Sequence, residues 1–422
     1  MSYPQSGILN RPPDHLVAAA FTFVTTEPAK VRSTLAALRA VIERELTSAL
    51  DNTHPGSDKS TPSDETGELG FNSGYDRYHL TVTVGFARSG FDKLGVAAEQ
   101  QPQDLVAIPW PLLGDTPEVA DNGDLLVQVC SESIYINEHV IRRIGEELGD
   151  ELTLTWIVAG AQRHTSRNGR VNASEGRAMI GFLDGTSNLD PRAVPADRRL
   201  VFVDPLDMAD YPPQVPAIAP TDPNPYAQGQ PAPTFPPDLR PVPASEPEWT
   251  AGGTYAVVRA STLDLAAWDT TALGEQEQIV GRWKVSGAAL DQADDPLVPP
   301  AEPNFAADPA GTVTRLASHV RKSNPRGPGD ELRRIFRRGY PLISAHVTGY
   351  RRGLVFIAFA RTITTQFEFI TRAWTTNLNF PVPGTDVDQL RRFESVLCGG
   401  YFFVPPLDRA SEPWSWHVPP AA

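Results

Sequence analysis

Apolar residues recur at two different periods in the first part of the chain, and each period indicates a type of secondary structure. Short apolar or alternating runs are typical of strands, whereas apolar residues at every third or fourth position are typical of helices. Strand patterns cover residues 16–24, 78–86, 123–130 and 152–159, and helix patterns cover residues 29–50 and 138–148. The predicted order is therefore strand, helix, strand, strand, helix, strand.

The second part of the chain shows a similar succession of patterns. Strands are predicted over residues 253–259, 345–347, 354–360 and 401–404, and helices over residues 263–280 and 364–374. The order in the first part is that of a ferredoxin-like unit. The sequence thus predicts an α+β fold of two duplicated ferredoxin-like domains (a dimeric α+β barrel within one chain), each an antiparallel sheet with peripheral helices.

The length of the chain and the distribution of proline indicate where the domains meet. A chain of 422 residues is long for a single core. Many of its 41 prolines lie between Tyr211 and Glu248, and proline does not fit regular helices or central strands. We interpret this segment as an extended surface insertion, with a Pro-rich recognition segment as the alternative. The expected units are an N-terminal domain over residues 1–200, a linker over 201–248 and a C-terminal domain over 249–422.

Charge and cysteine content exclude several classes of protein. A formal net charge of -14 disfavours binding to nucleic acid or to anionic membrane surfaces. The two cysteines, Cys130 and Cys398, form no CxxC pair, which argues against common zinc and iron–sulfur sites. There is no pattern of a signal peptide and no apolar run of membrane-spanning length, so we expect a cytoplasmic protein.

Three short segments contain residues that could carry chemistry, although each has an ordinary structural interpretation. Asp184 lies between two glycines and could simply cap a turn. His319 is one of eight scattered histidines without a chelating partner, which suits a haem with one proximal histidine better than other metal sites. Arg337 could belong to a solvated basic helix end closed by Gly339 and Pro341.

Taken together and in order, these segments resemble the dye-decolorising peroxidase family. Residues 181–186 resemble its GFxDGT motif, residues 319–326 its HxRxxNPR motif, and residues 337–341 its RRGxP-like motif. Arg337 follows His319 by 18 residues, which is similar to the family spacing. Further blocks that resemble the family lie at residues 275–282, 353–359 and 399–403.

The resemblance implies a haem b peroxidase with one haem per chain. His319 would be the proximal ligand of the haem iron. Asp184 would be the distal acid–base group, which takes a proton from hydrogen peroxide and returns it to the leaving oxygen. Arg337 would stabilise the anionic peroxide and the charge that develops as the O–O bond breaks. Because a carboxylate beside an arginine stays ionised in acid, we expect an acidic optimum for dye oxidation.

Further residues match positions that contact haem in the family. They are Gly185, Thr186, Ser187, Asn324, Pro325 and Arg326. Arg326 could pair with a haem propionate or form an ordinary surface ion pair. Three apolar residues of the strand at 354–360 could cover the haem or belong to the core, namely Leu354, Phe356 and Phe359.

Other details of the site rest on single residues. Glu394 is a candidate for the carboxylate that accepts a hydrogen bond from His319. Gly339 stands where some family members carry Asn or Ser, so a hydrogen bond to peroxide is lost and we expect a lower rate. Trp374 and Tyr350 are candidates for carrying electrons to the surface, or they are ordinary core aromatics.

The sequence therefore predicts an enzyme that reduces hydrogen peroxide and oxidises dyes, phenols or other one-electron donors. The family resemblance also implies a homo-oligomer. Two alternatives stay open: a haem-processing protein of the deferrochelatase type, and a haem-binding protein without peroxidase turnover. A ferredoxin-like protein without any cofactor is disfavoured by His319 in its sequence context.

Overall fold

The structure is a computed structural model that describes residues 2–50, 79–162, 176–184, 186–206, 218, 222–346, 349–408, 416 and 418–420. Several positions discussed above lie outside these ranges: Gly185, residues 78 and 347 of predicted strands, and residues 211–217 and 219–221 of the Pro-rich segment. None of the described helices is long and apolar enough to cross a lipid bilayer.

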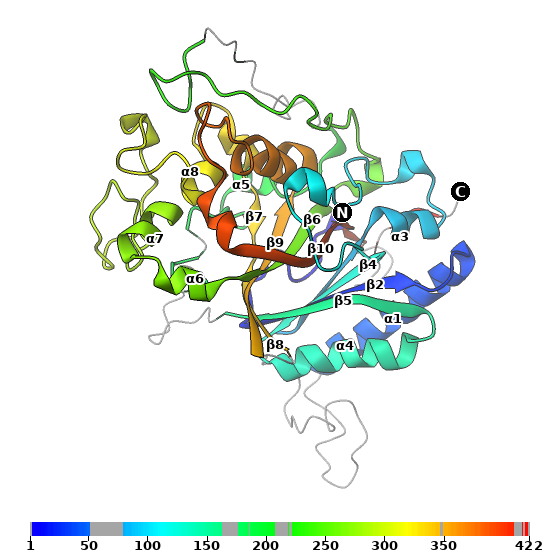
Figure 1. Cartoon of the computed structure of the whole chain (residues 1–422). Coiled ribbons are helices and arrows are strands. Elements are labelled where there is room, and N and C mark those ends of the chain that lie inside the picture. The colour runs from blue at the N-terminus through cyan, green and yellow to red at the C-terminus, as the bar shows by residue number, and fades with distance from the viewer. Residues whose placement is uncertain are drawn as a thin grey trace.

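The N-terminal half of the fold is a four-stranded antiparallel sheet with two helices on one face. Its strands are β2 (His15–Phe23), β3 (Thr81–Phe86), β4 (Leu125–Ser131) and β5 (Leu152–Ala161). They lie in the order β3-β4-β2-β5. Figure 1 shows α1 (Pro28–Leu50) and α4 (Ile134–Leu148) side by side along this sheet. The predicted succession of strands and helices in this half agrees with the structure.

The C-terminal half contains a second antiparallel sheet. Its strands are β6 (Thr254–Leu263), β7 (Phe336–Arg337), β8 (Tyr340–His346), β9 (Gly349–Ala360) and β10 (Glu394–Val404). They lie in the order β10-β6-β9-β8, and the short β7 pairs with β9 on the same edge as β8. The segments of His319 and Arg337, which line the cavity described below, lie between strands of this second sheet, whereas the segment of Asp184 follows β5 of the first.

The two sheets join at both edges and form one antiparallel barrel. β10 pairs with β3 on one side, and β5 pairs with β8 on the other. In the described part of the chain the barrel contains eight strands in the order β6-β10-β3-β4-β2-β5-β8-β9, closed by β6 and β9. Closure leaves the long strands of both halves paired, which protects their backbone edges.

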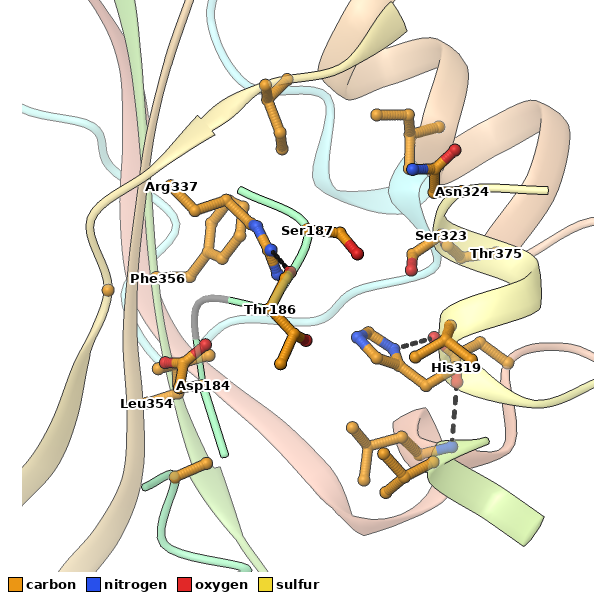
Figure 2. A pocket seen from close by; sticks show the side chains of 18 of the residues that line it. Asp184, Thr186, Ser187, His319, Ser323, Asn324, Arg337, Leu354, Phe356 and Thr375 are labelled. Atoms are coloured by element: carbon orange, nitrogen blue, oxygen red, sulfur yellow. Dashed lines mark hydrogen bonds and ion pairs between the residues drawn. The ribbon is translucent and has the colours of Figure 1, made fainter. Parts of the chain in front are cut away.

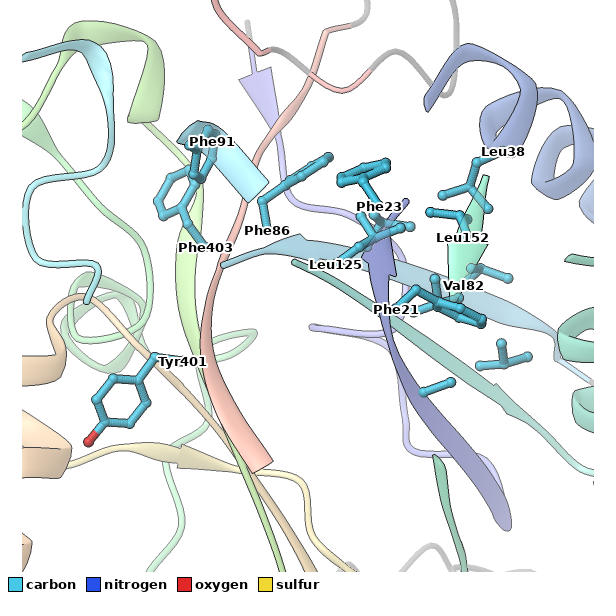
Figure 3. Close-up of a cluster of buried hydrophobic side chains, with 14 of the residues drawn as sticks. Phe21, Phe23, Leu38, Val82, Phe86, Phe91, Leu125, Leu152, Tyr401 and Phe403 are labelled. Carbon is cyan, nitrogen blue, oxygen red and sulfur yellow. The ribbon is translucent and has the colours of Figure 1, made fainter. Parts of the chain in front are cut away.

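Alternate residues of each strand point into the barrel or out of it. On β2, Leu16, Ala18 and Ala20 belong to the inner cluster of buried side chains, whereas the residues between them belong to the outer cluster. The small alanines suit the limited space inside a closed barrel. Figure 3 shows the outer cluster, in which Phe21, Phe23 and Leu38 pack between the sheet and α1.

Shorter elements connect these strands. They are β1 (Ser2–Tyr3), α3 (Arg88–Lys93), η3 (Ala98–Gln100), η4 (Trp110–Leu113), α5 (Pro195–Arg199), η6 (Glu248–Thr250), α6 (Leu265–Thr270), α7 (Leu273–Val280), η7 (Phe305–Ala307), α8 (His319–Ser323), η8 (Asp330–Arg333), η9 (Ile363–Glu368), η10 (Ile370–Thr375), η11 (Gln389–Phe393) and β11 (Leu407–Asp408). Here η9 and η10 are wide-turn π-helices, and the other η elements are 3-10 turns.

One predicted helix is wrong in its extent. Residues 263–280 form the end of β6 and then two helices, α6 and α7, because Thr271 between them has an extended backbone. The side chain of Asp264 accepts a hydrogen bond from the Ala267 amide and begins α6 one residue after the strand ends. The apolar period alone did not reveal the break at Thr271, because the period continues across that residue.

The Pro-rich segment is only partly a surface insertion. Its described residues up to 247 form no helix or strand, as expected from their proline content. However, Asn224 and Tyr226 are buried, and the ring of Tyr226 lies 4.8 Å from that of Phe380. The described part of the segment therefore packs against the region of η10 and is not confined to the surface.

The seam between β6 and β9 gives a test of barrel closure. A Cβ at Gly353 would lie 1.9 Å from the Ser261 carbonyl oxygen, so Gly353→Ala forces the two strands apart. We expect a loss of about 1–3 kcal/mol in the free energy of unfolding, measured by denaturant titration. Gly145→Ala on the exposed face of α4, where a Cβ meets nothing, is the matched control. It should not destabilise the protein, because alanine favours a helix over glycine. Equal stability of both variants would contradict a tight seam.

Candidate active site

A single cavity brings together most of the residues singled out in the sequence. It has a volume of about 300 Å³, at the lower end of the roughly 300–1,000 Å³ range of cofactor and ligand pockets. Its lining includes Asp184, Thr186, Ser187, His319, Asn324, Arg326, Arg337 and Gly339. Pro325 is described but does not line the cavity. Three separate segments of the chain thus converge on one space.

His319 begins α8 and lies on one side of this cavity. Its Nδ1 atom lies 2.7 Å from Oδ2 of Asp388, and in Figure 2 the other ring nitrogen faces the cavity. Asp388 is itself fixed, because its other carboxylate oxygen accepts a hydrogen bond from the Leu390 amide at the start of η11. The imidazole is thereby held in one orientation with one nitrogen available to a ligand.

Glu394, the candidate named from the sequence, is not the hydrogen-bond partner of His319. Glu394 begins β10 and accepts a hydrogen bond from Nη1 of Arg259 at 2.9 Å. It lies near His319, but the carboxylate in contact with the imidazole belongs to Asp388. No sequence motif pointed to Asp388, since it lies 69 residues after His319 in an irregular segment.

The charge of Asp388 changes the acidity of His319. Burial by itself would lower the pKa of the imidazole, but the nearby charge and the hydrogen bond of Asp388 outweigh it and raise the pKa above the usual value. The side chain is 37% exposed, and the exposed part faces the cavity, so the surroundings are those of the protein interior. An imidazole hydrogen-bonded to a carboxylate in this way is also a strong metal ligand.

Arg337 and the segment 186–188 form the opposite side of the cavity. Nη2 of Arg337 donates a hydrogen bond to the Thr186 carbonyl oxygen at 2.7 Å. The side chain of Asn188 binds the Arg337 backbone twice, accepting from its amide at 3.0 Å and donating to its carbonyl oxygen at 2.8 Å. Figure 2 shows Asp184 and Arg337 across the cavity from His319. The Asn188 contact therefore joins the loop of Asp184 to the strand of Arg337.

Further arginines gather at Ser187. Arg282 donates a hydrogen bond to its Oγ atom at 3.1 Å, and Arg334 donates to its carbonyl oxygen at 3.2 Å. Burial, together with the neighbouring Arg326 charge, lowers the pKa of Arg282 to about 10. Within the described residues, the buried Nε of Arg282 has no hydrogen-bond partner. This region therefore holds more positive than negative charge and suits an anionic group.

Arg326 shows features of both of its predicted roles. It lines the cavity, and it also forms an ion pair with Glu302 through Nε at 2.8 Å. Its side chain is mostly buried, whereas that of Glu302 is 58% exposed. The Arg326 side chain thus borders the cavity and at the same time holds an exposed carboxylate.

The remaining walls are apolar. Leu354 and Phe356 from β9 line the cavity, whereas Phe359 on the same strand belongs to the barrel interior. Trp374 also lines the cavity and is 1% exposed, so it does not reach the surface. Tyr350 is exposed but lies away from the cavity. Neither aromatic residue connects the cavity to solvent.

These side chains suit a haem group. One imidazole nitrogen, backed by a carboxylate on the other, is the donor that haem iron requires. Apolar walls suit the porphyrin faces, and the arginines around Ser187 suit its two carboxylates. No cluster of three or more possible metal-ligating side chains occurs among the described residues, which leaves His319 as a lone candidate ligand.

Three residues of the site were not identified from the sequence, namely Arg282, Arg334 and Asn188, because their roles depend on the loop conformation.

The contact between Asp388 and His319 predicts a titration in protein prepared without cofactor. The pKa of His319 should lie above the usual ~6.5. In Asp388→Asn the carboxylate charge is lost, burial dominates, and the pKa should fall below that value. Proton NMR titration of the imidazole measures this pKa in the unmodified protein and in Asp388→Asn. Asp386→Asn, which removes a carboxylate paired with Arg392, should leave the pKa of His319 unchanged.

The same shift has a consequence for stability. Because the folded-state pKa is raised, protonated His319 stabilises the fold below about pH 6.5, and this stabilisation is lost as pH rises through the folded-state pKa. Asp388→Asn should remove this part of the pH dependence of unfolding. An unchanged profile would show that the ion pair does not form in solution.

Comparison with known proteins agrees with this arrangement. Two family models match, "Dyp-type peroxidase, N-terminal" over residues 5–162 and "Dyp-type peroxidase, C-terminal" over residues 231–409. The deferrochelatases of Escherichia coli strains 536 and K12 are each 28% identical over 336 residues, which cover 78% of this chain. The match spans only 66% of the length of these relatives, just under two thirds.

Solved structures show the same fold. A DyP-type peroxidase from Cellulomonas bogoriensis superposes with a TM-score of 0.68 at 24% identity, covering 97% of this chain and 94% of the other. DtpA from Streptomyces lividans gives 0.69 at 21% identity, with 98% and 95% covered. At these identities the structures support the fold alone, whereas the two family models together cover most of the sequence. The chain therefore belongs to the Dyp-type peroxidase family.

Proposed function

We propose that this protein is a haem b peroxidase, with one haem per chain, that reduces hydrogen peroxide and oxidises dyes, phenols or other one-electron donors. The observation that carries the proposal is the cavity in which His319, oriented by Asp388, faces Arg337 and Asp184. The family of the chain and the ferric and oxyferrous forms described for its structural relative DtpA support it.

The residues of the cavity divide into those that hold the cofactor and those that act on peroxide. A bound haem supplies a redox-active iron at which the O–O bond of hydrogen peroxide can be cleaved. His319 would bind the iron through its cavity-facing nitrogen, and Asp388 makes that nitrogen a better donor. Ser187, Arg282 and Arg326 would hold the propionates, and Thr186 and Asn324 would contact the ring.

Asp184 and Arg337 act on peroxide from the other side. Asp184 would take a proton from hydrogen peroxide and return one to the leaving oxygen, so that water is released. Arg337 is fixed by Thr186 and Asn188, and its cation stabilises the negative charge that develops on the oxygen atoms. Gly339 offers no hydrogen-bonding side chain on this side of the cavity. An acidic optimum for dye oxidation is part of this proposal.

The deferrochelatases among the relatives give a second candidate function, the release of iron from haem. The same cavity would hold the haem, but release of iron requires no proton transfer to a leaving peroxide oxygen. Iron captured by a chelator from haem-loaded protein, without peroxide-dependent oxidation of a phenol, would favour this second function.

We also propose that the barrel arose from two duplicated ferredoxin-like units, over residues 1–200 and 249–422, joined by a Pro-rich linker. The strand order supports this proposal. β3-β4-β2-β5 in the first half corresponds to β8-β9-β6-β10 in the second when the strands are matched by their order in the chain. Family membership makes a homo-oligomer plausible as the assembly.

The first prediction of the proposed function concerns the two distal residues. Asp184→Asn removes the proton acceptor without changing its size, and the reaction with peroxide should slow by about 10²–10⁴-fold. Arg337→Leu removes the fixed cation and should slow it by about 10²–10³-fold. Stopped-flow absorption of the haem band measures both rates. Asp190→Asn, in the same loop but outside the cavity, is the control. A normal rate in Asp184→Asn would exclude it as the base.

The second prediction concerns the contact that places these residues. Asn188→Ala removes both hydrogen bonds to the Arg337 backbone, with an expected loss of about 1–3 kcal/mol in the free energy of unfolding. The reaction with peroxide should also slow, because Arg337 and the Asp184 loop lose their mutual position. Asn188→Asp keeps the acceptor but loses the donor and should be intermediate. Unchanged kinetics in Asn188→Ala would show that the contact does not position the site.

A further inference from the structure

The side chain of Arg338 points into the barrel, on the opposite side of the backbone from the cavity. Arg337 lines the cavity, whereas Phe336 and Tyr340, two residues before and after Arg338, belong to the inner cluster of buried side chains. The Arg338 amide donates a hydrogen bond to the carbonyl oxygen of Ile357, another member of that cluster. Because alternate residues of an extended chain face opposite sides, Arg338 is directed inward, and it is 5% exposed.

Part of the Arg338 guanidinium is left without a partner. Its Nη1 atom donates a hydrogen bond to the carbonyl oxygen of Asn10. Its Nε and Nη2 atoms are buried and have no hydrogen-bond partner in the described part of the chain. These two nitrogens lie on one edge of the planar group and direct their N–H groups the same way. That edge is the one that binds both oxygens of a carboxylate or a similar oxyanion.

The charge of Arg338 is also uncompensated. The neighbours whose charges act on it are Tyr340, Cys130 and Arg192. Burial raises the pKa of the Cys130 thiol to about 11 and raises the pKa of Tyr340 well above its usual value, so both groups are neutral at pH 7. Arg192 is itself a cation, and it pairs with Asp190 at 3.7 Å. Arg338 is therefore a buried cation without an anionic neighbour among the residues that the structure describes.

The N-terminal segment covers this guanidinium and brings a second arginine with it. The Tyr340 hydroxyl donates a hydrogen bond to the Pro13 carbonyl oxygen at 2.9 Å, and Arg338 contacts Asn10, so residues 10–13 lie over both side chains. Arg11 follows Asn10 in the chain. Its Nε and Nη2 atoms are buried and likewise have no hydrogen-bond partner within the described ranges. The segment thus adds positive charge and no carboxylate.

One acidic side chain acts near this end of the barrel, but its contacts lie elsewhere. The charge of Glu132 contributes to the raised pKa of Tyr340. Its carboxylate accepts a hydrogen bond from the Asp14 amide at 3.4 Å and lies 3.7 Å from Nδ1 of His79. Glu132 is not among the groups whose charge acts on Arg338. It therefore does not take the place of a counter-ion for the guanidinium.

These features restrict the ligand that would complete the site. A single unpaired guanidinium is balanced by a single negative charge, and a monovalent anion loses less hydration energy on burial than a divalent phosphate does. Two N–H groups in one plane suit two oxygens of a flat group, such as a carboxylate, bicarbonate or nitrate. The inner cluster around Arg338 is mostly apolar and closely packed, so the ligand has to be small.

We propose that Arg338 binds a small, planar, monovalent oxyanion inside the barrel, at a site separate from the cavity. Two oxygen atoms of the anion accept hydrogen bonds from Nε and Nη2, while Nη1 keeps its contact with Asn10. The bound anion neutralises the buried cation and fixes the residue that follows Arg337 in the chain. The proposal does not rest on the peroxidase function, since the donors of this site do not line the cavity.

Formate is the probe for this site, because it is the smallest planar carboxylate. Calorimetric titration of the haem-loaded protein with formate at constant ionic strength should show a saturable site whose affinity falls by at least about tenfold in Arg338→Lys. Lysine keeps the positive charge but lacks the planar pair of donors. Arg352→Lys, which replaces an exposed arginine on β9, is the matched control and should bind formate as the unmodified protein does.

Two further readouts separate this site from the cavity. Formate that binds in the cavity would shift the haem absorption band, whereas formate at Arg338 should leave that band unchanged. The unfolding midpoint reports binding independently, because a ligand that binds only the folded state stabilises it. At equal salt concentration, formate should raise the midpoint of the unmodified protein and of Arg352→Lys more than that of Arg338→Lys.

A crystal structure of the unmodified protein grown in formate does not depend on the folding of any variant. We expect planar density with both oxygen atoms within hydrogen-bonding distance of Nε and Nη2 of Arg338. Water alone at these nitrogens, or formate bound only to surface residues, would overturn the proposal. Equal affinity for formate in Arg338→Lys and in the unmodified protein would also overturn it, because formate would then be an adventitious ion only.

Discussion

The arrangement of the site depends on one contact, between the segment 186–188 and Arg337. Asn188 pairs with the backbone of Arg337 much as a neighbouring strand would, while the Arg337 side chain returns to the Thr186 carbonyl oxygen. Each side thus fixes the other. The loop that carries Asp184 follows the last strand of the N-terminal sheet, whereas Arg337 pairs with β9 of the C-terminal sheet. Barrel closure brings the two sheets together, and the contact of segment 186–188 with Arg337 then fixes the position of the Asp184 loop relative to Arg337.

Charge supplies the second constraint on the cavity. Several arginines converge on Ser187 and its neighbours, and burial lowers the pKa of Arg282 because its cation is poorly compensated. On the opposite side of the cavity a negative charge acts instead, since Asp388 binds the His319 imidazole and raises its pKa. A planar ligand with carboxylates at one edge and a metal at its centre satisfies both sides at once. Neither the arginines around Ser187 nor the His319–Asp388 pair alone would distinguish a haem from other anions.

The sequence predicted the parts of this site that lie in continuous motifs and missed those made by folding. His319, Asp184 and Arg337 were found because their neighbours in the chain form recognisable segments. Asp388 was missed and Glu394 was named instead, because the choice between two nearby carboxylates depends on the turn before η11. The succession of strands and helices along the N-terminal half followed from the apolar period, but the break at Thr271 and the burial of Tyr226 depend on tertiary contacts that local patterns do not contain.

The division of the site between the two halves has a consequence for each half by itself. Asp184 comes from the first half, and His319 and Arg337 come from the second, so neither half holds all of the residues that line the cavity. Either half expressed alone would therefore lack part of the wall of the cavity, whatever its own stability.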